Sequence, residues 1–323
     1  MTKSSIFVQA QSVVLILALS ACATLPNTQS VIVDEYVVEY AISGSGTPTV
    51  IFESGFGAPM SNWSKVFPEV AKFSSVFAYN RRGYEGSVSE SESQKGGMLE
   101  EALYFAGGQA IDSVIPGAST AISVASSIGD LEDDAPKVLD KRTVSTMVEE
   151  LRRVLKAKNI EPPYVLVGHS LGGLSSLYFA KRYPQEVSGL VLVDSTHPMQ
   201  LEKCYERFSK DKCDPPAYID SLMRVLHPDM YAEFKGIADS GKEVINAGRL
   251  HDIPYVVITR GKDVATGPEG VQWVWPELQN DLASYTSHST HVIAKESGHF
   301  VQNDEPHIVI KAIKDIVQES RKM

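Results

Sequence analysis

The pentapeptide around Ser170 is the strongest sign of chemistry in this sequence. Ser170 is the centre of Gly168-His169-Ser170-Leu171-Gly172, which follows the apolar run 164–167 and opens the helical stretch 171–183. A sharp strand-to-helix turn tolerates only very small neighbours, and it lifts the serine hydroxyl to a helix N-terminus, where developing negative charge is favoured. The pattern predicts that Ser170 is a nucleophile.

A serine hydroxyl is a poor nucleophile until a base removes its proton. His299 follows the apolar run 291–294 late in the chain, where the order serine, acid, histidine requires the base. His169 adjoins Ser170 but is expected to project away from it around the turn. The predicted base is therefore His299.

A carboxylate must orient the imidazole and stabilise its cation. Asp263 follows the apolar run 254–258 and precedes His299, and the usual order places the acid one strand before the histidine. Asp194, which ends the preceding run 190–193, is the alternative. We expect Asp263 to be the acid and Asp194 to bond loop amides.

The oxyanion of an acyl-transfer intermediate needs two backbone donors. One is expected to be the N–H of Leu171, directly after the nucleophile. The other is expected in the loop 53–57, after the apolar run 49–52, because its glycines let the backbone approach a substrate closely. Phe56 is the preferred donor in that loop, and Gly55 is the alternative.

Short apolar runs alternate with helical stretches along most of the chain. This alternation predicts a mainly parallel sheet with helices on both faces. Two inserts interrupt it, at about 94–140 and 196–252, and both follow strands. Ligands bind at the carboxyl ends of strands in such sheets, so the inserts are expected to be either lids over the site or plain loops and helices.

Three motifs together resemble the α/β-hydrolase superfamily over about residues 31–320. They are the elbow around Ser170, the turn 79–87, which is similar to D-R-x-G-x-G-x-S, and the segment 297–300 around the base. The resemblance implies an α/β-hydrolase fold with an eight-stranded, mostly parallel sheet, helices on both faces and inserted cap segments. Asn80 replaces the usual Asp, and Glu53-Ser54-Gly55 replaces the common His-Gly pair, which leaves the second oxyanion donor open.

The expected activity is that of an esterase-like or lipase-like serine hydrolase. A Ser170–His299–Asp263 triad would cleave a small-molecule or lipid ester, or a related acyl substrate, through an acyl-enzyme. By resemblance, a serine nucleophile disfavours haloalkane dehalogenase and epoxide hydrolase chemistry. The alternatives are a C–C bond hydrolase or cofactor-free perhydrolase on the same fold, or an inactive binding module. No metal or organic cofactor is implied.

The first residues indicate export. Lys3 and the apolar run 13–19 are typical of a signal peptide covering 1–21, and Leu19-Ser20-Ala21-Cys22 resembles a bacterial lipobox. We expect a lipid anchor with its acyl chains on Cys22, a tether over 22–30 and a hydrolase domain over 31–323. By resemblance, Ala23 after the anchor favours the outer membrane of a bacterial cell envelope, facing the periplasm.

Charge and the remaining cysteines restrict the partners. The formal net charge is −10, so no basic surface is expected that would bind nucleic acid. Cys204 and Cys213 form an even pair in an oxidising compartment and are predicted to form a disulfide, with two free thiols as the alternative. A zinc site is not expected, because two cysteines without a nearby histidine pair cannot complete a tetrahedral site.

Overall fold

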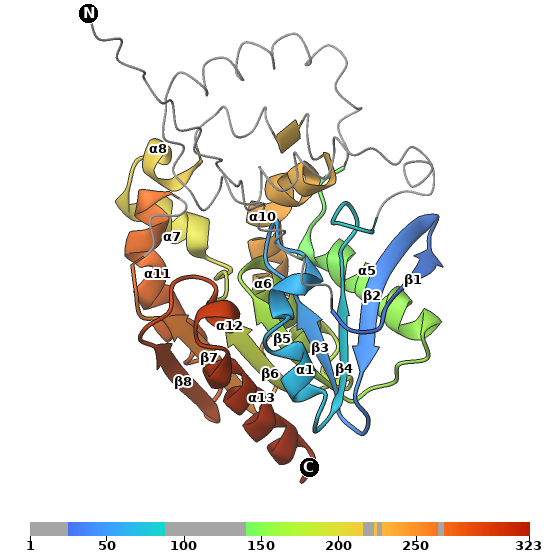
Figure 1. Ribbon diagram of the computed structural model, residues 1–323. Helices are drawn as coiled ribbons and strands as arrows, with labels where there is room; N and C mark the ends of the chain where they lie inside the picture. The colour runs from blue at the N-terminus through green and yellow to red at the C-terminus, as the bar shows by residue number, and fades with distance from the viewer. Residues whose placement is uncertain (1–24, 88–139, 216–222, 225–227, 264–267) are drawn as a thin grey trace, which may run out of the picture.

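One eight-stranded sheet organises the chain. The computed structural model describes residues 25–87, 140–215, 223–224, 228–263 and 268–323. The strand order is β1-β2-β4-β3-β5-β6-β7-β8 (Figure 1). The strands are β1 Thr28–Val33, β2 Tyr36–Ser43, β3 Thr49–Glu53, β4 Ser75–Tyr79, β5 Tyr164–His169, β6 Val187–Val193, β7 Tyr255–Arg260 and β8 Ser289–Ala294.

The predicted α/β-hydrolase architecture is confirmed. Strands β1, β2 and β4 pair antiparallel, and all pairings from β4 through β3, β5, β6 and β7 to β8 are parallel. β5 is buried along its whole length, as expected for a central strand covered by helices on both faces. The carboxyl ends of the parallel strands therefore meet along one edge, where sites form in sheets of this kind.

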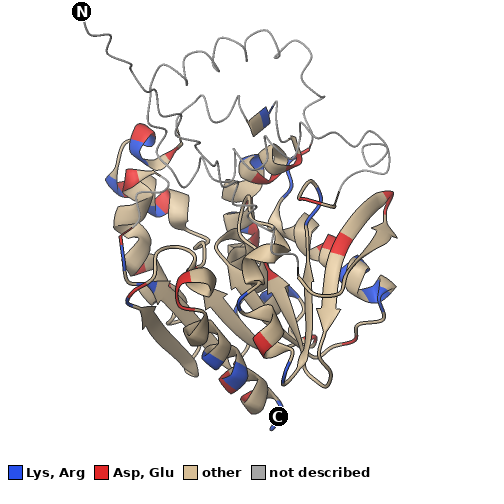
Figure 2. Cartoon of the chain, in the orientation of Figure 1, with Lys and Arg blue, Asp and Glu red and all other residues tan. Residues whose placement is uncertain are grey.

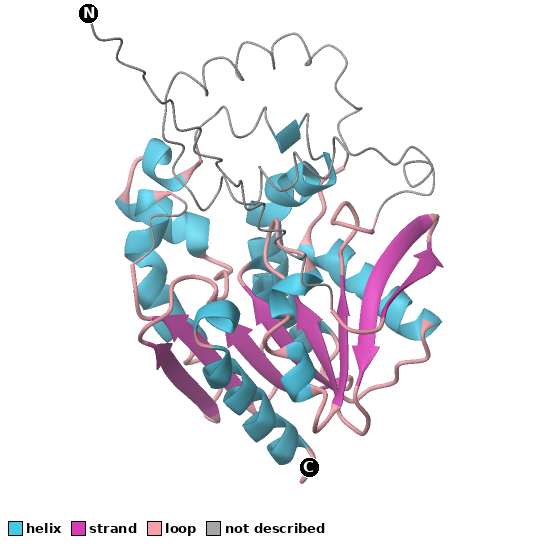
Figure 3. Ribbon diagram, viewed as in Figure 1, coloured by secondary structure: helices cyan, strands magenta, loops and turns pink. Residues whose placement is uncertain are grey.

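Helices cover both faces of the sheet, as Figure 3 shows. On one face of the sheet, the apolar core contains residues of helices α5 and α6, and α10 packs against both of these helices. On the opposite face, the core contains residues of η1, α1, α12 and α13. Their bounds are α5 Val144–Ala157, α6 Leu171–Arg182, α10 Pro228–Asn246, η1 Met60–Trp63, α1 Phe67–Val70, α12 Val301–Asp304 and α13 Pro306–Ser320.

A third, smaller cluster holds the cysteines. Helices α7 Gln200–Arg207 and α8 Lys210–Cys213 pack against α11 Glu269–Leu282. Cys204 and Cys213 form the predicted disulfide, with their Cα atoms 5.8 Å apart. The described part of the second insert is therefore helical, whereas the first insert lies outside the described residues except for Asp140.

The predicted tether is too long. Leu25 is buried and Thr28 already begins β1, which pairs with β2 along its whole length. Residues 25–30 are part of the folded domain, because burial of Leu25 and the strand pairing hold them on the sheet edge. The signal peptide and Cys22 lie outside the described residues.

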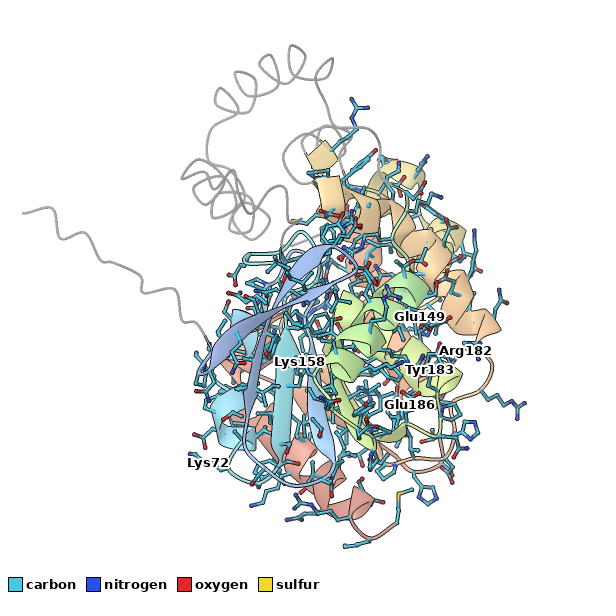
Figure 4. All side chains as sticks on the ribbon, turned by 90° about the vertical axis from the view of Figure 1, so that its right-hand side faces the viewer. Lys72, Glu149, Lys158, Arg182, Tyr183 and Glu186 are labelled. Carbon is cyan, nitrogen blue, oxygen red and sulfur yellow. A yellow bond between two sulfur atoms is a disulfide. The ribbon has the colours of Figure 1, made fainter. Side chains whose placement is uncertain are left out.

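The outer face of α5 and α6 shows how charged residues are placed. Figure 4 shows Glu149, Tyr183 and Glu186 near one another, with Lys158, which directly follows α5, farther away. Arg152 lies 3.7 Å from the centre of the Tyr183 ring and pairs with Glu186 at 2.6 Å. Lys and Arg are interspersed with Asp and Glu over the drawn elements (Figure 2). Within the described ranges, no helix has the length and apolar content to cross a bilayer.

Candidate active site

The turn between β5 and α6 holds Ser170 in a backbone conformation that few side chains adopt. Ser170 has φ 52° and ψ −121° and is the N-cap of α6. Its neighbours have no room for a side chain: a Cβ on Gly168 would lie 2.4 Å from Gly172 O, and one on Gly172 would lie 2.4 Å from Glu53 O. Positive φ at a non-glycine residue is strained and clusters at functional sites. The turn has the geometry expected for a nucleophile, and Ser170 is partly exposed.

His299 meets a carboxylate beside this turn. His299 Nδ1 lies 2.6 Å from Asp194 Oδ2. When Nδ1–H donates to the carboxylate, Nε2 is left as the acceptor for a proton. This is the relationship between base and acid that a serine nucleophile requires.

The prediction that Asp263 holds His299 is wrong. Asp263 is exposed in the loop beyond Arg260, where β7 ends, whereas Asp194 directly follows β6 and is fully buried. A residue at the immediate end of a strand stays at the sheet edge, but a loop residue farther along can turn into solvent. Asp194 also precedes His299 in sequence, so the order serine, acid, histidine is kept.

Asp194 is held by more than the imidazole. Arg260 Nη1 lies 2.6 Å from Asp194 Oδ2, and Trp275 Nε1 donates to Oδ1 at 2.8 Å. The backbone N–H of Arg260 also donates to Oδ1 at 3.2 Å. Burial alone would raise the pKa of Asp194, but His299 and then Arg260 outweigh it and hold that pKa below its usual value. Asp194 is therefore an ionised acceptor with a fixed orientation.

His169 supports the backbone of the base. Its Nε2 lies 2.9 Å from the His299 carbonyl oxygen, and the two ring centres are 4.6 Å apart. Burial, together with the charge of His299, lowers the pKa of His169 to about 3. The ring is therefore neutral, and its Nε2–H donates to the carbonyl. This role of His169 was not predicted from the sequence pattern.

The segment 54–57, which we call the oxyanion loop, lies against the nucleophile turn. A Cβ on Gly55 would come within 3.2 Å of Ser170 Cβ. Gly57 N–H donates to Tyr84 Oη at 3.2 Å, so it is not available to a substrate. Of the two predicted donors, Phe56 follows Gly55 in this loop, and Leu171 is the first residue of α6, where helix N–H groups lack partners within the helix.

A buried arginine lies beneath the oxyanion loop. Arg81 Nη1 donates to Ser54 O at 2.7 Å, and its Nη2 donates to Gly55 O at 2.9 Å. The same guanidinium pairs with Glu233 of α10 at 3.0 Å. Arg81 belongs to the turn 79–87 that was singled out in the sequence, but Glu233 lies in the second insert and carries no sequence signal.

Glu53, at the end of β3, has an unusual titration. Its carboxyl accepts a hydrogen bond from Tyr79 Oη at 2.8 Å and lies 3.7 Å from Arg81 Nη1. Burial raises the pKa of Glu53 to about 7, although Arg81 opposes the shift. Burial therefore favours the protonated form of Glu53 at pH values where an ordinary glutamate is ionised.

Several groups at this site were not found from the sequence. Arg260 and Trp275 can be assigned to the site only from the folded structure, in which β7 and α11 lie next to Asp194. Glu233 can be assigned only because α10 contacts Arg81. A usable signal existed for Asp194, because it directly follows an uninterrupted apolar strand. Among the described residues, His, Cys, Asp and Glu form no group of three or more that could hold a metal ion.

Known proteins share this architecture. A family model described as the alpha/beta hydrolase fold matches residues 48–243. The uncharacterized protein YqjL of Bacillus subtilis (strain 168) is 24% identical over 283 residues, which cover 84% of this chain and 85% of YqjL.

Solved structures agree on the fold. A thermophilic esterase from Thermogutta terrifontis superposes with a TM-score of 0.57 at 17% identity, covering 91% of this chain and 98% of the esterase. A membrane phospholipase A, described as a bacterial virulence factor, gives 0.55 at 18% identity, covering 94% and 88%. At such identities the likeness establishes the fold alone. With the family match over residues 48–243, the chain belongs to the α/β-hydrolase fold family.

Proposed function

We propose that this protein is a serine hydrolase that cleaves a carboxylic ester or a related acyl substrate. The observation that carries the proposal is the 2.6 Å contact between His299 Nδ1 and Asp194 Oδ2, formed beside the strained Ser170 turn. A buried acid, an imidazole and a partly exposed serine at the carboxyl edge of one sheet are the parts that acyl transfer needs. The esterase and phospholipase among the structural neighbours are consistent with this class of substrate.

The reaction follows from the assigned groups. His299 Nε2 takes the proton of Ser170 Oγ as that oxygen attacks the acyl carbon, and Asp194 stabilises the imidazolium. The Leu171 and Phe56 N–H groups stabilise the tetrahedral oxyanion. His299 then returns the proton to the departing alcohol, which leaves an acyl-Ser170 ester. Water, deprotonated by His299, hydrolyses that ester and regenerates the serine.

Labelling with a fluorophosphonate tests the nucleophile. The probe is expected to modify Ser170 in the folded wild-type protein, and labelling should be lost in Ser170→Ala. Ser284→Ala, a change at an exposed serine, is the matched control and should still be labelled. Hydrolysis of a p-nitrophenyl ester series should be lost in the same variant. Folded protein that is neither labelled nor active on esters would contradict the proposal and favour a binding module.

We also propose that the chain is exported and lipid-anchored through Cys22. The support is the apolar run 13–19 followed by Leu19-Ser20-Ala21-Cys22. In a bacterial host, the wild-type chain is expected to appear in the membrane fraction and to be labelled by a palmitate analogue. Cys22→Ala is expected to be absent from the membrane fraction and unlabelled. Unchanged membrane association of Cys22→Ala would contradict the anchor.

A further inference from the structure

Helix α10 lies over the oxyanion loop, although its residues are far from that loop in sequence. Met230 Cε would lie 3.4 Å from a Cβ on Gly57, and the Phe234 ring centre is 6.3 Å from that of Phe56. The same helix packs against α6, which begins after Ser170 (Figure 1). The second insert therefore contacts the part of the site where the oxyanion would be stabilised.

Glu233 is the charged group that α10 brings to this contact. The residue is 1% exposed, and its carboxylate accepts hydrogen bonds from Arg81 Nε at 3.0 Å, Arg81 Nη2 at 3.1 Å and Tyr84 Oη at 2.7 Å. Arg142 Nη1 donates to it as well, at 3.1 Å. Burial alone would raise the pKa of Glu233, but Arg81 and Arg142 outweigh it and keep that pKa below its usual value. Glu233 is thus a buried carboxylate with each oxygen occupied.

The partners of Glu233 fix the direction of the loop peptides. Arg81 donates to the carbonyl oxygens of Ser54 and Gly55, at 2.7 and 2.9 Å. Neither of the peptides that follow these carbonyls is among the cis bonds of the chain, so each N–H points opposite to its carbonyl. The N–H groups of Gly55 and Phe56 therefore point away from Arg81. Tyr84 Oη holds the next N–H, that of Gly57, at 3.2 Å.

We propose that Glu233 is a positioning residue for catalysis: through Arg81 and Tyr84 it holds the oxyanion loop so that the Phe56 N–H can meet the oxyanion. The inference rests on the proposed function and adds to it a dependence of the oxyanion site on the second insert. Glu233 touches no reacting atom. Its effect passes through one guanidinium fork and one phenol, both of which bond the loop backbone directly.

The variant Glu233→Gln tests this role with little change of shape. One oxygen acceptor and one charge are lost, so Arg81 is held less firmly and the loop peptides can rotate. We expect kcat for a p-nitrophenyl ester to fall about 100-fold, the cost typical of a misplacement of about 1 Å, while KM changes less than about twofold. The affinity for an alkyl boronic acid, which forms a tetrahedral adduct on the serine, should fall in parallel with kcat.

Glu243→Gln is the matched control. Glu243 lies on the same helix and also anchors it, since its carboxylate accepts from Thr143 Oγ1 at 2.8 Å and from the Ser145 N–H at 2.9 Å. These partners are at the start of α5 and not on the oxyanion loop. We expect Glu243→Gln to lower stability and leave kcat within about twofold. Equal losses of kcat in both variants, or an unchanged kcat in folded Glu233→Gln, would overturn the proposal.

Two further variants keep the test decisive if Glu233→Gln does not fold. Arg81→Lys keeps the charge but replaces the planar fork, which bonds both carbonyl oxygens and Glu233, with a single ammonium, and Tyr84→Phe removes the hydroxyl between Gly57 and Glu233. Both are expected to lower kcat with little change in KM. Full activity in Arg81→Lys would overturn the role of the fork.

Amide hydrogen exchange tests how firmly the oxyanion loop is held and needs no substrate. Amide exchange over the oxyanion loop is expected to accelerate in Glu233→Gln and Tyr84→Phe and to match wild type in Glu243→Gln. Unchanged exchange in the first two variants would overturn the positioning role. If the wild type hydrolyses no ester and resists the fluorophosphonate, the proposed function fails, but the exchange measurement still decides whether Glu233 holds the loop.

Discussion

Two buried arginine–carboxylate pairs serve the site in different ways. In one, Asp194 binds His299 directly and Arg260 binds the same carboxylate oxygen. In the other, Glu233 binds Arg81, and Arg81 reaches the site through backbone carbonyls. In the proposed mechanism the first pair acts on a proton and the second on the direction of peptide dipoles. Similar ion pairs can therefore support a reaction through charge or through backbone geometry, and their variants should fail differently.

The largest effect is expected on the Asp194 side. Asp194→Asn replaces the carboxylate that orients His299 and stabilises its cation, so kcat should fall about 10³–10⁴-fold. Asp263→Asn should stay within about twofold of wild type, because Asp263 is exposed. Steady-state kinetics on one ester decides between them. A large loss in Asp263→Asn together with an active Asp194→Asn would refute the assignment.

On the oxyanion side, the charge of the Glu53 carboxyl should instead affect the pH dependence of stability. The folded-state pKa of Glu53, about 7, lies above its ordinary value of 4.5, so between these pH values the folded protein binds more protons than the unfolded chain. Stability from this group is therefore lost as pH rises through that window, by about 3 kcal/mol in total.

Glu53→Gln should remove that loss. Urea unfolding at pH 5 and pH 8 is expected to show a smaller decrease in the variant than in wild type. Equal decreases in the two proteins would show that Glu53 does not titrate inside the fold in this range.

Arg260→Gln is expected to have an intermediate effect. It removes one charge-assisted hydrogen bond to Asp194, so kcat at neutral pH should fall about tenfold. Arg260 also helps to hold the pKa of Asp194 down, so the stability that the ionised Asp194 contributes should be lost at a higher pH in the variant than in wild type as the pH falls. Urea unfolding over an acidic pH series measures this. Arg207→Gln, at an exposed pair with Glu277, should leave that pH dependence unchanged.

The smallest effect is expected for Trp275→Phe. The change removes the Nε1–H that donates to Asp194 at 2.8 Å while keeping most of the ring. Because His299 and Arg260 still bind the carboxylate, kcat should fall only about threefold. A loss as large as that of Asp194→Asn would mean that Trp275, and not the ion pair, determines the orientation of the acid.

The elbow geometry, the pairing of His299 with a carboxylate, the disulfide and the sheet could be predicted because each depends on local sequence. Gly168 and Gly172 mark a turn without room for side chains, and apolar runs mark buried strands. The acid could not be chosen in this way. Its identity depends on which carboxylate stays at the sheet edge, and spacing along the chain does not distinguish Asp194 from Asp263.

The second insert shows another limit on what can be predicted from the sequence. Glu233 reaches Arg81 across 152 positions of sequence. No periodicity or motif within the insert indicates such a partner, because the contact depends on how α10 crosses the sheet edge. Buried charged residues on otherwise ordinary helices are visible only after packing is known.

The backbone of Ser170 has a consequence for the history of such a protein. At φ 52° and ψ −121° a side chain costs about 1–3 kcal/mol, and glycine alone adopts this conformation freely. A descendant that no longer needed the hydroxyl would become more stable by accepting glycine at position 170. Under the proposed function, selection for activity opposes this gain in stability. Ser170→Gly should melt at a higher temperature than Ser170→Ala.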